Sequence, residues 1–361
     1  MQENLNKSDA SGGAIDRLLL RDFRPVSRLV VPVTQVPKAK YPVIDMHCHG
    51  RQGSGGRELP AEHDIRAWIA AMDAVNVEKS VVLTMANGEL FKTIADLCEK
   101  FSERLYLFCG FYTADWEKPD FPKRSIADLK ACIRNGAKGI GEIVDKGSGI
   151  LAGSGDTWSG LHLFDEKCQP VMDACAAFNI PISLHTGDPV WSYLEPDGSN
   201  EAAFSAQIYN TYGQGLPGMK EQLEWQEKIL NLYPRNRFIL CHLGNLSHDL
   251  AAFGALLDAH PAVYADFSGR FTDLARQPRQ ARNFFIRYQD RLLYGTDMGT
   301  DQSMYSETFR VLETADEYFD APGGGGFQGT KYSKGWKGYG LDLPDQVLKK
   351  IYNTNAAAVM K

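Results

Sequence analysis

Two histidines stand two positions apart at the end of the apolar run VIDMHCHG, residues 43–50. The run predicts a β-strand, and because side chains alternate between the faces of a strand, His47 and His49 point to the same side. Histidine is the commonest side-chain ligand of divalent transition metals. The spacing therefore predicts a shared metal site; the alternative is that one imidazole packs in the core and the other faces solvent.

Further residues of ligand type follow later apolar runs: Glu142, His185, His242 and Asp297. If these runs are parallel strands of one barrel, their C-terminal ends meet at one rim, where barrel active sites lie. Chance placement of so many ligand-type residues at strand ends is improbable, so we predict a metal site at this rim. A donor set of mostly nitrogen with carboxylates fits Zn best and also suits Mn, Fe or Co, as one or two ions per chain.

Short apolar runs and helix-like segments alternate along the chain and must position these residues. The predicted strands are Val43–His47, Ser80–Met85, Leu105–Phe111, Lys138–Ile143, Ile180–His185, Phe238–His242, Val263–Phe267 and Leu292–Thr296. The predicted helices are Asp64–Val75, Leu90–Phe101, Ile126–Asn135, Gln169–Phe178, Met219–Leu232, Leu246–His260 and Gln280–Tyr288. Such alternation predicts a parallel sheet, and eight units predict an α/β fold of the (β/α)8 TIM-barrel type, with an open doubly wound sheet as the alternative.

Residues 1–40 are predicted to form an N-terminal arm, because their prolines favour extended chain. Residues 41–361 are predicted to form a single barrel domain. The arm could wrap a neighbouring chain in a homo-oligomer or pack on its own barrel. Two long loops, residues 186–217 and 321–340, are rich in aromatic side chains. Loops of this length in a compact domain are usually functional or disordered, and the aromatic content favours packing or substrate contact.

The order of these strand-end residues resembles the amidohydrolase superfamily, in particular its amidohydrolase 2 branch, to which aminocarboxymuconate-semialdehyde decarboxylase-like enzymes are related. The stretches that carry the resemblance are LHTGDP, CHLGN, RLLYGTD and LKKIYNTNAAAV, and it extends from Tyr41 onward. The resemblance implies a distorted (β/α)8 barrel with one or two divalent metals and a metal-bound water.

The resemblance also implies roles for individual residues. His47 and His49 would ligate the first metal, and Asp297 would ligate that metal and take the proton from the attacking water. His185 and His242 would hold a second metal. With a single metal, His185 would instead be a ligand, and His242 would polarise the substrate or shuttle a proton.

Glu142, in the stretch GIGEI, resembles the strand-four glutamate that bridges two metals in some families. A carboxylate has two oxygens and can bind one ion with each, which favours the bridging role. The alternative is that Glu142 orients a histidine ligand through a hydrogen bond.

Other residues bear on the substrate or have no assigned chemistry. Arg270 follows the seventh predicted strand and could pair with a substrate carboxylate, or could be an exposed loop arginine. Trp191 and Trp158 are predicted to line the substrate pocket, or else to pack their loops. Asp45 is expected to point into the barrel interior, and His162 is expected on a surface loop or a helix end.

These residues predict a metal-dependent hydrolase in which a metal-activated water attacks an amide, ester, lactone or related bond of a small molecule. The alternative is a lyase, a non-oxidative decarboxylase or hydratase of an aromatic or unsaturated carboxylic acid, which generally works with one metal. A non-enzymatic metal-binding or ligand-binding barrel is the third hypothesis. It would require every coordination position to be closed by protein.

Composition excludes some partners. The net charge of -6 gives no general attraction to nucleic acid or to an anionic membrane, so neither is predicted as a partner. The seven cysteines form no close CxxC pair, which favours reduced, buried thiols. Residues 1–16 lack the layout of a secretory signal and no long apolar run exists, so a cytoplasmic location is expected, although a removed export signal would leave the same sequence.

Overall fold

The computed structural model describes residues 17–19, 26–50, 62–152, 157–202, 210–297, 302–320 and 336–361. Residues 1–31 and 32–361 are two separate units, and the second contains every predicted strand. The boundary predicted at residue 40 stays a prediction. The tips of the two aromatic loops, residues 203–209 and 321–335, lie outside the described residues, together with the glycine-rich stretch 51–61.

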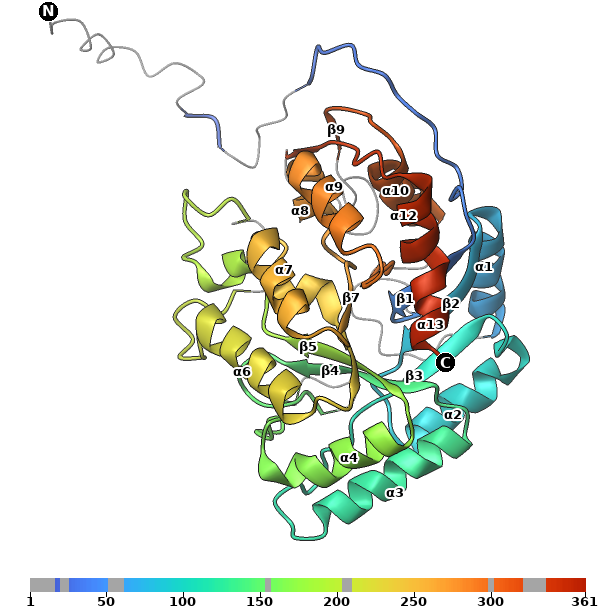
Figure 1. Ribbon diagram of the computed structural model, residues 1–361, viewed down its shortest axis with the longest axis vertical. Helices are drawn as coiled ribbons and strands as arrows, with labels where there is room; N and C mark the ends of the chain where they lie inside the picture. The colour runs from blue at the N-terminus through green and yellow to red at the C-terminus, as the bar shows by residue number, and fades with distance from the viewer. Residues whose placement is uncertain are drawn as a thin grey trace, which may run out of the picture. The chain divides into compact units, whose positions relative to one another are not determined.

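The unit 32–361 is built on eight parallel strands that follow one another in sheet order from β1 to β8. They are β1 (Val43–Cys48), β2 (Val77–Leu83), β3 (Leu105–Cys109), β4 (Gly139–Asp145), β5 (Pro181–Thr186), β6 (Arg237–Leu240), β7 (Tyr264–Asp266) and β8 (Leu292–Leu293). Figure 1 shows the strands running through the middle of this unit with helices around them. The prediction of a (β/α)8 TIM barrel is confirmed.

Backbone hydrogen bonds join the first strand to the segment that follows the last one. Met46 N donates to Tyr294 O at 2.8 Å, and Thr296 N and Asp297 N donate to His47 O at 3.1 and 2.8 Å. These bonds connect β1 with the chain beyond β8, so the barrel has a seam where its two ends meet. The predicted eighth strand, residues 292–296, is regular only at its first two residues, because beyond them the chain bends toward β1.

Helices lie between the strands and after the last one. They are α1 (Glu62–Ala74), α2 (Gly88–Cys98), α3 (Phe121–Arg134), α4 (Gln169–Ala177), α6 (Met219–Leu232), α7 (Leu250–Ala259), α8 (Phe271–Arg276), α9 (Pro278–Arg287), α10 (Gln302–Glu313), α12 (Asp345–Lys349) and α13 (Asn355–Val359). Short 3-10 turns are η3 (Glu99–Phe101), η4 (Glu166–Cys168), η5 (Val190–Tyr193) and η6 (Cys241–Asn245), and η7 (Lys350–Thr354) is a π-helical turn. A two-stranded antiparallel ribbon joins β9 (Phe319–Asp320) and β10 (Lys337–Gly338). Among the described residues, no helix has the length and apolar character needed to cross a membrane.

The buried side chains form two layers, as alternation along barrel strands requires. One cluster fills the barrel interior and contains Ile44, Met46, Val81, Leu83, Phe108, Ile239 and Leu293, with Ala356 and Val359 of α13. The larger cluster packs between the strands and the surrounding helices. The π-helical turn η7 contributes to this arrangement, because Ile351 O accepts a hydrogen bond from Tyr294 N at 2.9 Å.

Asp45 does not point into the barrel interior as expected. It is fully buried and accepts hydrogen bonds from Thr296 Oγ1 at 2.8 Å and Tyr305 Oη at 3.2 Å, so it ties β1 to the chain after β8 and to α10. The pairing of β1 with β2 is irregular between Asp45 and Cys48. This irregularity interrupts the alternation of side chains, which lets His47 face the rim although Met46 already faces the interior.

Candidate metal centre

The strand-end residues predicted as ligands converge at the rim of the barrel. His47 Nε2 lies 3.4 Å from Asp297 Oδ1 and 3.8 Å from Glu142 Oε1. His49 Nε2 lies 3.2 Å from the same Asp297 oxygen and 3.5 Å from Glu142 Oε2. His47, in β1, and His49, directly after its end, therefore both face the two carboxylates, as their spacing predicts.

The histidines of β5 and of the β6 loop approach Glu142 from another side. His185 Nδ1 forms a 2.6 Å hydrogen bond with Glu142 Oε1. His242 Nε2 lies 3.4 Å from that oxygen and 3.7 Å from Asp297 Oδ2. Glu142 is thus central to the cluster, with Oε2 facing His49 and Oε1 facing His185, His242 and, at 3.8 Å, His47.

Three imidazoles are held by hydrogen bonds on their outer nitrogens. His49 Nδ1 lies 3.0 Å from Leu83 O, and His242 Nδ1 lies 2.8 Å from Ser268 O. Since a carbonyl oxygen only accepts, each Nδ1 carries the proton, and in the neutral ring Nε2 presents its lone pair to the centre. His47 Nδ1 lies 3.0 Å from Asp266 Oδ2, which orients its ring in the same way. This is how proteins orient histidine ligands of metals.

Asp266 of β7 also belongs to the centre, although the sequence pattern did not single it out. It is fully buried, and besides His47 it accepts hydrogen bonds from His242 N at 3.1 Å and Ser268 Oγ at 2.6 Å. It therefore orients two histidines of the centre at once. The signal in the sequence was a single carboxylate inside the apolar run of the predicted seventh strand, where a buried charge requires a partner.

The charges of the centre favour cations. Burial by itself would raise the pKa of the Glu142 and Asp297 carboxyls, but the neighbouring histidines hold both pKa values well below the ordinary range. Burial would lower the pKa of His47, but the carboxylates around it, Asp266 first among them, raise that pKa well above its usual value. The pKa of His49 is raised in the same way, to about 9, by Asp297 and Glu142. The carboxylates thus stay ionised and attract positive charge into the centre.

The side chains fit a divalent metal. Three groups have their donor atoms within 4.8 Å of one another: His47, His49 and Glu142; His47, His242 and Asp266; and Glu142, His185 and His242. His47 Nε2 and His185 Nε2 are buried without a hydrogen-bond partner in the protein. Buried nitrogens of this kind are costly unless a ligand satisfies them, and a metal ion would do so.

Among the described residues of the centre, Asp297 and His49 are the most exposed. The side chains of Asp297 and His49 are 31% and 22% exposed, whereas those of His47, Glu142 and His242 are almost fully buried. Water or a small substrate therefore reaches the centre past Asp297 and His49.

The chain around His242 departs from the predicted strand. β6 ends at Leu240, and His242, Leu243 and Gly244 then take left-handed backbone angles, with φ of 58, 55 and 57°. Asn245 continues this left-handed turn with φ of 60°. Left-handed backbone costs about 1–2 kcal/mol per non-glycine residue. The turn aims the His242 imidazole at the centre, which a continued strand would not do.

The predicted substrate residues lie at three different places. Arg270 is beside the centre: its charge, after burial, is what lowers the pKa of His242. Trp191 is half-buried in η5, where its carbonyl accepts a hydrogen bond from Asn200 Nδ2 at 3.0 Å. Trp158 is 38% exposed and pairs with Leu151 in an isolated β-bridge. Contact of either tryptophan with substrate stays a prediction.

His162 is not a free surface residue. Its Nδ1 lies 2.7 Å from Asp145 Oδ2, and its ring stacks on Phe164 with an interplanar angle of 3°. The hydrogen bond to Asp145 raises the pKa of His162 above its ordinary value of about 6.5.

We expect this pair to make the stability depend on pH. Because the folded protein favours protonated His162, its stabilisation is fully present below pH 6.5 and is lost as the pH rises through the higher pKa of the folded state. The substitution His162→Gln should therefore lower the free energy of unfolding by about 1 kcal/mol more at pH 5.5 than at pH 9. The fall in Tm should be correspondingly larger at pH 5.5. Phe164→Leu, which keeps the hydrogen bond, should lower Tm equally at both pH values. Equal effects of His162→Gln at the two pH values would contradict this account.

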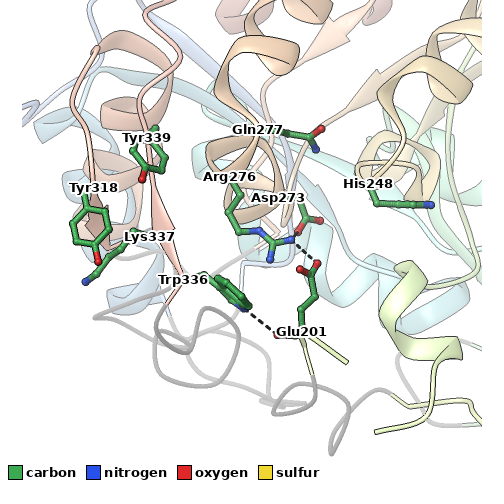
Figure 2. A pocket seen from close by; sticks show the side chains of 9 residues that line it. All are labelled: Glu201, His248, Asp273, Arg276, Gln277, Tyr318, Trp336, Lys337 and Tyr339. Atoms are coloured by element: carbon green, nitrogen blue, oxygen red, sulfur yellow. Dashed lines mark hydrogen bonds and ion pairs between the residues drawn. The ribbon is translucent and has the colours of Figure 1, made fainter. Parts of the chain in front are cut away.

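A cavity of about 650 Å³ lies among the loops that follow β5 to β8, on the face of the barrel that carries the centre. Its walls are Glu201, His248, Asp273, Arg276, Gln277, Tyr318, Trp336, Lys337 and Tyr339. Figure 2 shows Arg276 between Glu201 and Asp273 and above Trp336. The guanidinium lies 2.8 Å from Glu201 and 3.4 Å from Asp273, so its charge is already paired. Trp336 and Tyr339 belong to the second predicted aromatic loop.

Comparisons with known proteins bear on the fold and on the family of the chain. No curated protein sequence matches the chain. Among solved structures, the chain is similar to the uncharacterised TIM-barrel protein Bb4693 of Bordetella bronchiseptica, with a TM-score of 0.55 and 15% identity over 88% of this chain and 98% of that one. It is also similar to 2,6-dihydroxybenzoate decarboxylase of Rhizobium, with a TM-score of 0.51 and 16% identity over 89% and 98%. At such identities, these likenesses establish the fold alone.

The family to which the chain belongs follows from its sequence. The family model described as "Amidohydrolase" matches residues 44–361, which include all eight barrel strands except the first residue of β1. The resemblance predicted from the strand-end motifs is thereby confirmed, and the chain belongs to the amidohydrolase 2 family.

Proposed function

We propose that the chain is a metal-dependent hydrolase that uses an activated water to cleave an amide, ester, lactone or related bond of a small molecule. The observation that carries the proposal is the placement of Glu142. Its two oxygens face different histidines of the centre, with Oε2 at 3.5 Å from His49 and Oε1 at 2.6 Å from His185. A carboxylate so placed suits the bridge of a two-metal site, which is a common arrangement in hydrolases. The 2.6 Å contact also fits the alternative in which Glu142 only orients His185.

The residues would divide the metal sites as follows. His47 and His49, with Asp297, would hold one ion, and His185 and His242 a second, with Glu142 between them. Zn fits this donor set best, with Mn, Fe and Co as alternatives. A bound divalent ion supplies one effect, the lowering of the pKa of a water from about 15.7 to about 7.

Asp297 is the residue we assign as general base. It is ionised, it lies at the open side of the centre, and its Oδ1 is 3.2 Å from His49 Nε2. Asp297 would take a proton from the attacking water and then give it to the leaving amine or alcohol as the C–N or C–O bond breaks. If a single ion is bound, His242 Nε2, which presents its lone pair to the centre, would shuttle a proton instead of binding metal.

A second candidate is non-oxidative decarboxylation of an aromatic or unsaturated carboxylic acid, and Arg270 favours it. Among the described residues, the Arg270 guanidinium forms no ion pair with a carboxylate, and its Nε is buried without a partner. A cation beside His242 that forms no ion pair within the described part of the chain suits a substrate carboxylate. Arg270 would serve a hydrolase equally if the substrate carries a carboxylate away from the cleaved bond.

The experiment that tests the proposal measures two quantities in the same reaction: incorporation of ¹⁸O into the product and release of CO₂. The zinc-loaded protein is incubated in H₂¹⁸O with a panel of lactones, esters, amides and hydroxybenzoic acids. Hydrolysis is expected to place one ¹⁸O atom in the acid product, with Asp297→Asn as the inactive control. Release of CO₂ from an acid, without ¹⁸O in the remaining product, would overturn hydrolysis in favour of the second candidate.

A further inference from the structure

The side chain of Asn245 connects three parts of the catalytic rim. It is buried, with 2% exposure, at the end of the left-handed turn. Its Nδ2 donates to Thr186 O and Gly187 O, both at 3.0 Å, and its Oδ1 accepts from Arg270 Nη2 at 2.5 Å. Both polar atoms of the amide are therefore used, and the partners belong to two segments, the end of β5 with the residue after it and the chain after β7.

These segments carry the residues of the centre. Thr186 follows His185 directly, and Asn245 itself lies three residues after His242 in the same turn. Arg270 lies two residues after Ser268, whose carbonyl holds His242 Nδ1. A displacement of the Asn245 amide would therefore also displace His185, His242 and Arg270.

The helix α6 confines the turn from behind. A Cβ added at Gly187 would lie 2.9 Å from Tyr193 Oη and 3.1 Å from Gln222 Oε1, and one added at Gly244 would lie 3.0 Å from Gln226 Nε2. Both glycines have positive φ. The turn that carries Asn245 is therefore closely packed against α6, with no room for a side chain at Gly187 or Gly244.

Because the Asn245 amide is neutral, it can hold the Arg270 guanidinium without neutralising its positive charge. A carboxylate at position 245 would hold the guanidinium equally well, but it would neutralise its charge. The neutral amide oxygen positions the guanidinium without neutralising its charge, and among the described residues Arg270 forms no ion pair with a carboxylate. An uncompensated, partly buried arginine next to a reaction centre binds oxyanions strongly.

We propose that Asn245 is a positioning residue that holds Arg270 at the rim with its charge free, and so selects substrates that carry a carboxylate or similar planar oxyanion. The proposal deepens the proposed function and rests on it for the identity of the reaction, but not for the binding preference.

The test measures that preference directly. Calorimetry on the zinc-loaded protein compares benzoate with benzamide, which has nearly the same shape and no charge. The wild type is expected to bind benzoate at least about tenfold more tightly, the size of one charge-assisted hydrogen bond. Asn245→Asp, which introduces a counter-ion for Arg270, should abolish most of that ratio, and Arg270→Gln should do the same. Arg276→Gln, which removes a rim arginine already paired with acids, should leave the ratio unchanged.

A second variant separates positioning from folding. Asn245→Gly removes the amide and tolerates the left-handed backbone, so it should keep its zinc content while losing the benzoate preference. Tm and zinc content are measured for every variant. A wild-type ratio near one, or a full ratio retained in Asn245→Asp and Asn245→Gly, would overturn the proposal. If the preference depends on Asn245 but no substrate is hydrolysed, the proposed function fails and the role of Asn245 stands.

Discussion

Replacing Asp297 with asparagine should reduce kcat by about 10³-fold while the protein stays folded, since general acid–base catalysis contributes about 10²–10⁴-fold. The amide cannot accept the proton that the ionised carboxylate takes. The fold should survive because the Asp297 backbone N–H, not its side chain, bonds to His47 O at 2.8 Å. Asparagine also tolerates the left-handed φ of 53° found at this position.

The measurement is steady-state kinetics on the best substrate of the panel, with Tm and zinc content recorded for each protein. Asp342→Asn is the matched control, because Asp342 also has a left-handed backbone, with φ of 47°, and is not part of the centre. The control should keep its activity. An Asp297→Asn protein with wild-type kcat would remove Asp297 from the mechanism.

The second large effect concerns metal content. Protein purified without added metal or chelator should hold about two metal equivalents per chain, and Glu142→Ala should hold one or fewer, because two-metal sites depend on a shared anionic ligand. The structural reason is the central place of Glu142, whose Oε1 lies 2.6 Å from His185 Nδ1 and 3.4 Å from His242 Nε2.

Elemental mass spectrometry measures the content, and Glu142→Gln repeats the test with the shape of the side chain preserved. Glu313→Ala is the control, since Glu313 is a partly buried glutamate that bonds to Lys40 N and Tyr352 Oη, away from the centre. One equivalent in the wild type, unchanged in Glu142→Ala, would support a single-metal site and would shift the search to decarboxylation.

The regular part of the fold could be predicted from the sequence. The strands are short apolar runs that recur between amphipathic segments, and α6 begins and ends where the pattern placed it, at Met219 and Leu232. The ligand-type residues could be predicted because His and acidic side chains are rare at the ends of apolar strands, and parallel strands bring those ends together.

The rest of the centre depends on contacts that local sequence does not encode. Asp266 looks like one polar residue within a strand, and its role appears only when β7 lies beside the His242 turn, 24 residues earlier in the chain. The sequence pattern predicts a continued strand where the left-handed turn lies, because Cys241 and Leu243 are apolar. Asp45 accepts a hydrogen bond from Thr296, which lies 251 residues later in the chain. A contact between residues so far apart cannot be predicted from the pattern of neighbouring residues.

The seam of the barrel has a consequence for synthesis of the chain on the ribosome. The pairing partners of β1 at the seam are residues 294–297, so the outer edge of β1 stays unpaired while almost 250 intervening residues are made. An open strand edge is a site of aggregation, and contacts so distant in sequence form slowly. The emergence of residues 294–297 both covers that edge and brings Asp297 to the histidines, so a nascent chain acquires its sealed sheet and its proposed general base in the same step.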